Sequence, residues 1–173
     1  MKKTKKITNQ AMIAAIYTVI SVALSAITFG TVQVRVSEAL TLLPLFSITN
    51  IWGVTIGCFL TNLIGFFTGA NILGGLDMVF GTLATFSAAL CTYILRKVRI
   101  KNLPVFSVIP PILFNAVVVG WELCILISGG FNTVVFIAQA ASVALGQFVS
   151  CGIIGLAMVK YIEKHDSLKQ LIS

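Results

Sequence analysis

The sequence predicts an all-α integral membrane protein, a single domain (1–173) of six transmembrane helices with both termini in the cytoplasm. Hydrophobic residues make up 58% of the chain and charged residues only 10%, and the mean hydropathy is +1.03. A soluble domain carries about 25% charged residues, and it could not cover so much apolar surface. The distribution of the basic residues predicts the number of spans.

Eleven of the twelve Lys and Arg residues fall in three clusters, which the positive-inside rule places in the cytoplasm. An even number of spans must then separate successive clusters. Stretch 7–95 has room for four spans of about 20 residues, and stretch 103–159 has room for two. No basic face exists outside the clusters, so the net charge of +7 predicts no nucleic-acid partner. The clusters are Lys2, Lys3, Lys5 and Lys6; Arg96, Lys97, Arg99 and Lys101; and Lys160, Lys164 and Lys169.

The first predicted helix, about 7–28, carries Ala11 and Ala15 one turn apart. Small residues at this spacing leave a smooth strip where another backbone can approach. The strip fits packing within this chain, and it equally fits a docking surface for a second protein.

The second predicted helix, about 36–48, is short and begins beside two charges, Arg35 and Glu38. Three residues apart, these side chains would share one face of a helix. Each charge costs about 2.5–3.5 kcal/mol in the middle of a membrane helix, so the pair is a candidate for function. Short segments at membrane depth are tolerated where they line a cavity.

The third and fourth helices are predicted at about 51–67 and 76–95, joined by a Gly-rich outer loop. A ladder of small residues on the third helix indicates close packing against a neighbouring helix. Asp77 lies in the first turn of the fourth helix, where an acid either complements the helix dipole or serves a binding site. The ladder is Gly53, Gly57, Thr61, Gly65 and Gly69.

The fifth and sixth helices are predicted at about 104–127 and 133–161. Pro110 and Pro111 should bend the fifth helix. Asn115 and Glu122 share a face of that helix. Trp121, beside Glu122, fits either an interfacial anchor or a platform for a ligand. The sixth helix places Gln139 and Gln147 on one stripe.

Four ionisable side chains lie within the apolar segments: Arg35, Glu38, Asp77 and Glu122. Two acids remain after Arg35 is paired, so a shared binding space would be net negative and would suit a cation or several N–H donors. A carboxylate accepts two parallel N–H bonds, which the edge of a guanine-like base offers, and aromatic rings can stack on its face. The HExxH, GxSxG and P-loop motifs are missing, which predicts a transport subunit with no ATPase site, cofactor or metal centre.

Three segments resemble the queuosine-precursor transporter family: 34–44 (VRVSEALTLLP), 57–65 (GCFLTNLIG) and 76–85 (LDMVFGTLAT). These proteins are substrate-binding S components of energy-coupling factor (ECF) transporters in the cell membrane. The resemblance implies six helices with a pocket near the outer face, which docks on a transmembrane coupling protein and two ATPases. The implied substrates are deazaguanines such as preQ1 or queuine, and Ala11 and Ala15 match the docking strip.

Position and charge select the expected binding residues. Glu38 or Glu122 is expected to take the N–H pair of a guanine-like edge, another acid to balance the ammonium group, and Arg35 to orient Glu38. Three alternatives stay open: an S component for another vitamin such as thiamine or riboflavin, a self-sufficient proton-coupled transporter or channel, and a purely structural subunit. The expected substrate-binding set is Glu38, Asp77, Asn115, Trp121, Glu122 and Gln139.

Overall fold

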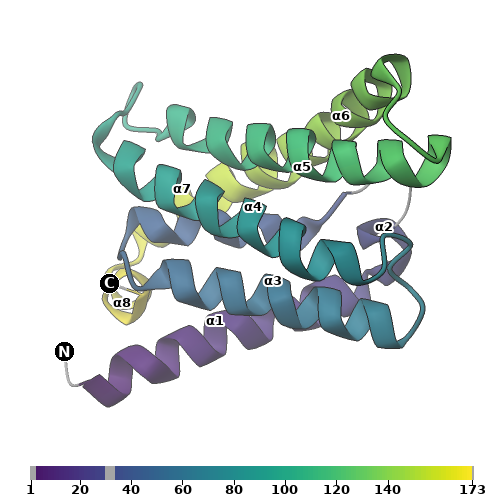
Figure 1. The fold of residues 1–173 in the computed structure, drawn as a ribbon. Coiled ribbons are helices and arrows are strands. Elements are labelled where there is room, and N and C mark those ends of the chain that lie inside the picture. Colours follow the sequence, from purple (N-terminus) through teal and green to yellow (C-terminus); the bar gives the residue numbers. More distant parts are fainter. Residues whose placement is uncertain (1–2, 30–33, 173) are drawn as a thin grey trace.

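A computed structural model describes residues 3–29 and 34–172, which form helices and no β-strand (Figure 1). Four helical stretches of this part are long and apolar enough to cross a membrane, and 36–45 is a shorter apolar helix. The all-α class is therefore confirmed, while the count of six spans stays a prediction. The four long stretches are Asn50–Phe67, Gly75–Lys97, Val105–Ser128 and Thr133–Lys164.

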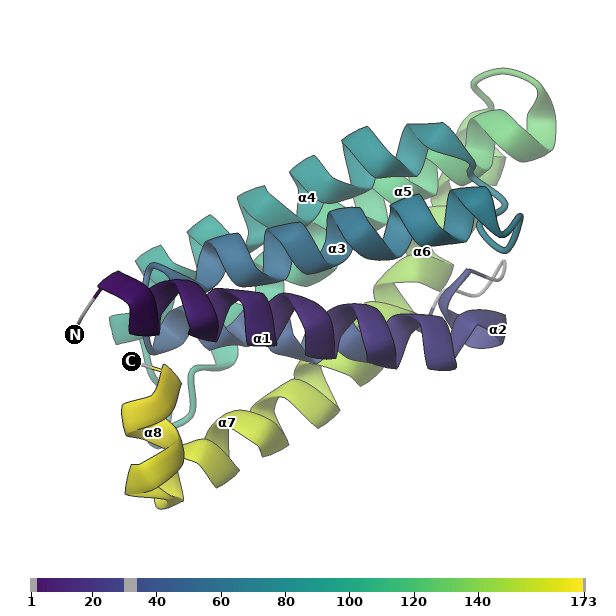
Figure 2. The same cartoon turned by 90° about the horizontal axis from the view of Figure 1, so that it is seen from below.

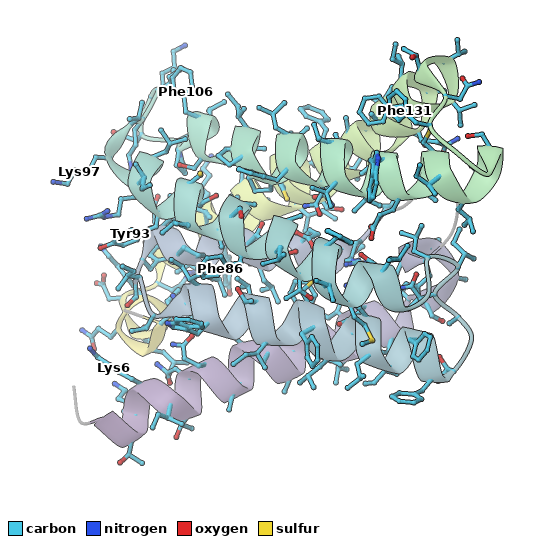
Figure 3. The ribbon with its side chains drawn as sticks, viewed as in Figure 1. Lys6, Phe86, Tyr93, Lys97, Phe106 and Phe131 are labelled. Carbon is cyan, nitrogen blue, oxygen red and sulfur yellow. The ribbon has the colours of Figure 1, made fainter. Side chains whose placement is uncertain are left out.

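Both termini lie at one end of the bundle (Figure 1), which we call the terminal end. Lys6 and Lys97 extend at this end, whereas Phe131 lies at the opposite one (Figure 3). That opposite end, called the loop end, carries α2 (Ser25–Thr28) and the loop that precedes α4. The basic clusters thus gather as the sequence predicts, although the side of the membrane that they face stays a prediction.

The N-terminal helix α1 (Lys3–Ala23) packs along α3 (Asn50–Phe67). A Cβ atom on Gly57 would lie 2.7 Å from Cβ of Tyr17, and one on Gly53 would lie 2.8 Å from Oε1 of Gln10. Gly57 leaves no room for a side chain against Tyr17, whereas at Gly53 the end of the flexible Gln10 side chain can move and the tighter limit is Cβ of Ile13 at 3.0 Å. Both glycines thus lie where the two helices approach closely. The predicted packing role of the small-residue ladder is confirmed at these positions.

The segment η1 (Val36–Leu45) is a ten-residue 3₁₀ helix in the middle of the bundle. Runs of this helix longer than three or four residues are uncommon and often mark functional segments. η1 contacts α1, α3 and α4, and eight of its residues are buried. The predicted helix 36–48 therefore exists but is a 3₁₀ helix and ends at Leu45.

The second half of the bundle begins with α4 (Gly75–Ile94), which runs on through η2 (Leu95–Lys97). Next come η3 (Val105–Val108) and α5 (Ile109–Ser128). Pro110 and Pro111 lie at the start of α5, where their missing N–H groups would be unpaired in any case. The prolines therefore begin α5 directly after η3 and do not lie in the first half of one long α-helix, while the predicted bend stays a prediction.

The C-terminal part is one long helical run that ends in a short helix. It comprises α6 (Thr133–Gln147), a π-helical stretch η4 (Phe148–Gly155) and α7 (Leu156–Lys164). The last helix, α8 (Asp166–Ile172), turns back toward the start of α1 (Figure 2).

Candidate functional site

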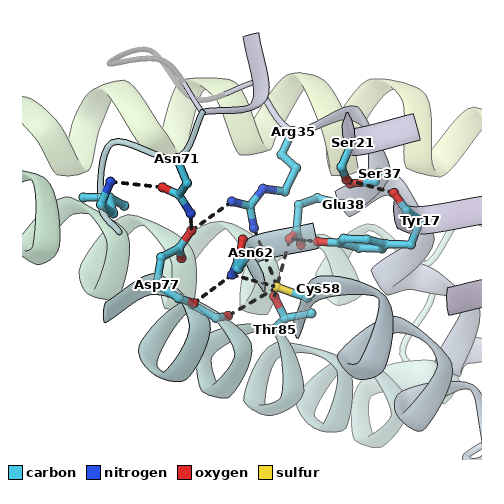
Figure 4. Close-up of polar contacts among 12 residues, drawn as sticks. Tyr17, Ser21, Arg35, Ser37, Glu38, Cys58, Asn62, Asn71, Asp77 and Thr85 are labelled. Atoms are coloured by element: carbon cyan, nitrogen blue, oxygen red, sulfur yellow. Dashed lines mark hydrogen bonds and ion pairs between the residues drawn. The ribbon is translucent and has the colours of Figure 1, made fainter. Parts of the chain in front are cut away.

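A buried ion pair anchors a polar cluster at the loop end. Nη2 of Arg35 lies 3.2 Å from Oδ2 of Asp77, and the two side chains are only 4% and 0% exposed (Figure 4). Asn71, in the loop before α4, donates to the same oxygen at 2.9 Å. The guanidinium also lies over the ring of Phe29, 5.7 Å from its centroid. One carboxylate thus joins the start of α4, the loop before it and the residue preceding η1.

Glu38 is fully buried and is held by two hydroxyl groups. Its Oε1 accepts hydrogen bonds from Tyr17 of α1 and, at 3.4 Å, from Thr85 of α4. The sequence expectation placed Arg35 beside Glu38, but the structure pairs Arg35 with Asp77. The cause is local: Arg35 precedes η1 with an extended backbone (φ −90°, ψ 92°), so the helical spacing between the two residues does not apply.

Among the three buried acids, Glu122 of α5 makes the fewest hydrogen bonds. It is 2% exposed, and neither carboxylate oxygen has a hydrogen-bond partner among the described residues. It interacts electrostatically with Asp77 and Arg35, as Glu38 also does. The three acids and Arg35 therefore form one electrostatic cluster.

The unpartnered polar atoms of this cluster are all acceptors. Nδ2 of Asn62 donates to the backbone carbonyl of Asp77 at 2.7 Å, which leaves its Oδ1 without a donor. A buried polar atom without a partner costs about 1–3 kcal/mol, and such atoms call for a water molecule, an ion or a ligand. The five atoms are Oε2 of Glu38, Oδ1 of Asn62, Oδ1 of Asp77, and Oε1 and Oε2 of Glu122.

The other expected binding residues make different contacts. Asn115 is buried and donates to the carbonyl of Pro111 in its own helix at 3.0 Å. Trp121 is 38% exposed and packs edge-to-face on Phe80, with centroids 5.8 Å apart. Gln139 is half-buried on α6. None of the three is hydrogen-bonded to the acidic cluster in the described structure, so their roles stay predictions.

Four residues of the cluster are absent from the expected set: Tyr17, Asn62, Asn71 and Thr85. Tyr17, Asn62 and Thr85 are hydrogen-bonded to acids that lie far away in the sequence. Asn71 lies in the loop before α4 and is hydrogen-bonded to Asp77. The sequence marks three of them only as isolated polar residues within apolar helices. Asn62 stands just off the small-residue ladder, whereas Tyr17 and Thr85 had no distinguishing spacing.

Ala11 and Ala15 lie on a different surface, away from the acids. Both are exposed, whereas the carbonyl of Ala14 packs toward Gly57 of α3. The two alanines line an apolar groove of about 540 Å³ between α1 and α3. The α1–α3 contact thus uses Ala14 and leaves the strip open. The groove is lined by Ile7, Gln10, Ala11, Ala14, Ala15, Trp52, Ile56 and Leu60.

Comparison with known proteins places the chain in a family. The family model described as QueT transporter matches residues 7–164. A relative named queuosine precursor transporter QueT, from Lactococcus lactis subsp. cremoris (strain MG1363), is 41% identical over 81 residues, which cover 44% of this chain and 48% of the relative. The match thus spans about half of the relative's length. No solved structure matches the chain. Because the family model covers most of its length, the chain belongs to the QueT transporter family.

Proposed function

We propose that this protein is the substrate-binding S component of an ECF-type ABC importer in the cell membrane. It binds a queuosine precursor, a deazaguanine such as preQ1 or queuine, from outside. A partner module then energises delivery into the cell. Membership of the QueT transporter family supports the transport role, and the name of the matched relative supports the substrate.

The observation that carries the proposal is the surplus of buried acceptors at the loop end. Among the described residues, the buried acids Glu38, Asp77 and Glu122 share one buried cation, Arg35, and five acceptor oxygens of the cluster have no donor. A deazaguanine presents a ring N–H, an exocyclic amino group and a pyrrole N–H, and preQ1 adds an ammonium group. Such a ligand supplies the donors and the positive charge that the cluster lacks.

The proposed site combines the acids with the aromatic and amide residues predicted from the sequence. Glu38, Asp77 and Glu122 receive the ligand's donors, while Asn115, Trp121 and Gln139 complete the walls. Arg35 acts as a positioning residue, because it holds Asp77. Asn71 links the preceding loop to the same carboxylate, so entry of a ligand near Asp77 is coupled to that loop.

The groove that contains Ala11 and Ala15 is the proposed docking surface for the transmembrane coupling protein, which also carries two ATPase subunits. Two observations support it: both alanines are exposed, and the groove walls are apolar apart from Gln10. A coupling helix can approach closely over such small residues. This arrangement requires the termini and the basic clusters to face the cytoplasm.

Thermal-shift measurements on the purified chain test the substrate. PreQ1 and queuine should stabilise the protein, by about 2.7 kcal/mol at one hundred times the Kd, whereas thiamine and riboflavin should not. A shift with only thiamine or riboflavin would favour an S component for another vitamin.

Uptake and mutagenesis test the remaining alternatives. Uptake by this chain alone into liposomes, driven by a pH gradient without ATP, would favour a proton-coupled transporter. Full transport by a complex in which Glu38, Asp77 and Glu122 are all neutralised would favour a structural subunit.

A further inference from the structure

The three buried acids differ in how far their oxygens are already engaged. Oδ2 of Asp77 accepts hydrogen bonds from both Arg35 and Asn71. Oε1 of Glu38 takes two hydroxyl groups. Neither oxygen of Glu122 accepts a hydrogen bond from the described residues. Only Glu122 can therefore offer a whole carboxylate to a ligand without losing a contact that the fold already makes.

The stretch of α5 on both sides of Glu122 is firmly packed. Val119, one turn earlier, belongs to a buried cluster with Leu123 of α5, Val143 of α6 and Leu73 of the loop before α4. The backbone of α5 is held close to α6, because a Cβ atom on Gly120 would lie 2.8 Å from Cα of Ala140. The backbone that carries Glu122 is therefore fixed in position, which is one requirement for discrimination between similar ligands.

Resting on the proposed function, we propose that Glu122 is the specificity-determining residue of the site. Its two oxygens accept the parallel N–H pair of a planar heterocycle that carries a ring N–H beside an exocyclic amino group. The free oxygens of Glu38 and Asp77 each take a single N–H or an ammonium group. The acceptor of the N–H pair, which the sequence leaves open between Glu38 and Glu122, is thereby assigned.

Paired ligands test this assignment directly. One is preQ1, and the other is its analogue without the 2-amino group, which offers only one of the two N–H donors. The wild-type protein should bind preQ1 at least about tenfold more tightly, because a hydrogen bond to a charged group contributes about 1.5–3 kcal/mol and 1.4 kcal/mol is tenfold in affinity. The measurement is calorimetric titration of the purified protein in detergent.

The variant Glu122→Gln should lose about 100-fold in affinity for preQ1, since its amide would turn an N–H group toward one N–H of the pair. It should also bind both ligands almost equally. Glu38→Gln should lose less affinity and keep the preference for the 2-amino ligand. Glu163→Gln is the matched control, because Glu163 lies at the terminal end, away from the three acids. Its Oε1 lies 2.7 Å from Nη1 of Arg99.

Folding is checked separately through the melting temperature of the unliganded variants. Glu122→Gln should melt no lower than the wild type, because it removes a buried carboxylate that has no partner. If that variant fails to fold, Glu122→Asp keeps the charge with a shorter reach and should show weakened affinity with the preference reduced. A preference that survives in the Glu122 variants would overturn the assignment and leave the proposed function standing. A wild-type protein that binds no deazaguanine would overturn both.

Discussion

Buried polar side chains gather at both ends of the bundle, but among the described residues the carboxylate oxygens without a hydrogen-bond donor all lie toward the loop end, whereas the terminal end leaves only the Ser107 hydroxyl unpartnered. At the terminal end, Asn50 donates to the carbonyls of Leu43 and Ile172 at 3.0 and 2.9 Å. Its Oδ1 accepts from Gln10 at 3.3 Å, and Gln10 in turn accepts from the backbone N–H of Gly53. Toward the loop end, five acceptor oxygens have no donor among the described residues. A satisfied network holds helices together, whereas an unsatisfied one leaves room for a water molecule, an ion or a ligand.

The two ends also use different chemistry. The terminal end uses neutral amides, which saturate themselves on backbone carbonyls and tie α8 to α1 and α3 (Figure 2). The loop end uses carboxylates, each of which costs several kcal/mol in a membrane when unpaired. The first arrangement stabilises the fold, and we propose that the second serves ligand binding.

The largest expected effect concerns the cation of the loop end. Arg35→Met should destabilise the unliganded protein by about 3–5 kcal/mol, because it leaves Asp77 buried and without its charge partner. The measurement is chemical or thermal unfolding in detergent. The double variant Arg35→Met/Asp77→Leu should recover most of the loss, and a double variant as unstable as the single one would contradict the role of the pair.

A smaller effect is expected from the glycine beneath Asp77. A Cβ atom on Gly81 would lie 1.8 Å from Oδ1 of Asp77 and 3.2 Å from Nδ2 of Asn62. Gly81→Ala should therefore turn the carboxylate away from Arg35, cost about 1–3 kcal/mol as an overpacked site does, and weaken ligand binding. Gly75→Ala is the control, because the nearest atom to its Cβ would be 3.9 Å away. Equal behaviour of the two variants would argue against a steric role for Gly81.

At the terminal end, Asn50→Ala should lower stability without changing the affinity of the folded protein for its ligand. It removes three hydrogen bonds, which at about 0.6 kcal/mol each in membrane proteins amount to about 2 kcal/mol. Denaturation and calorimetric titration of the same sample separate the two quantities. A loss of affinity at matched folded fraction would break the distinction between the two ends.

The smallest expected effect belongs to Tyr17→Phe, which keeps the ring and removes one hydrogen bond to Glu38. Stability should fall by about 0.6 kcal/mol, and affinity should change by no more than about threefold. Tyr93→Phe, at the terminal end, should leave affinity unchanged. A complete loss of binding in Tyr17→Phe would mean that the hydroxyl itself meets the ligand.

The sequence predicts the long helices well because the membrane sets the length of an apolar span and the side on which basic residues gather. The predicted segments 51–67 and 76–95 correspond to α3 and α4 almost residue for residue. The same arguments do not predict the details of the backbone. Apolar composition does not distinguish the 3₁₀ helix η1 from an α-helix, and Pro110 can start a helix as readily as bend one.

The acids of the site were predictable because a charge in an apolar segment is costly wherever it lies. Their partners were not, since Arg35 and Asp77 are 42 positions apart and Tyr17 and Glu38 are 21 apart. Only the packing of α1, α4 and η1 brings these groups together. The sequence therefore predicts that the acids are buried together, but not which of their oxygens are already paired within the fold.

The most direct test of the account is an experimental structure of the protein with preQ1 bound. The account predicts that the ring N–H and the 2-amino group lie within hydrogen-bond distance of the two oxygens of Glu122. Further donors should meet the free oxygens of Glu38 and Asp77. A ligand bound elsewhere, with those five acceptor oxygens still lacking donors, would contradict it.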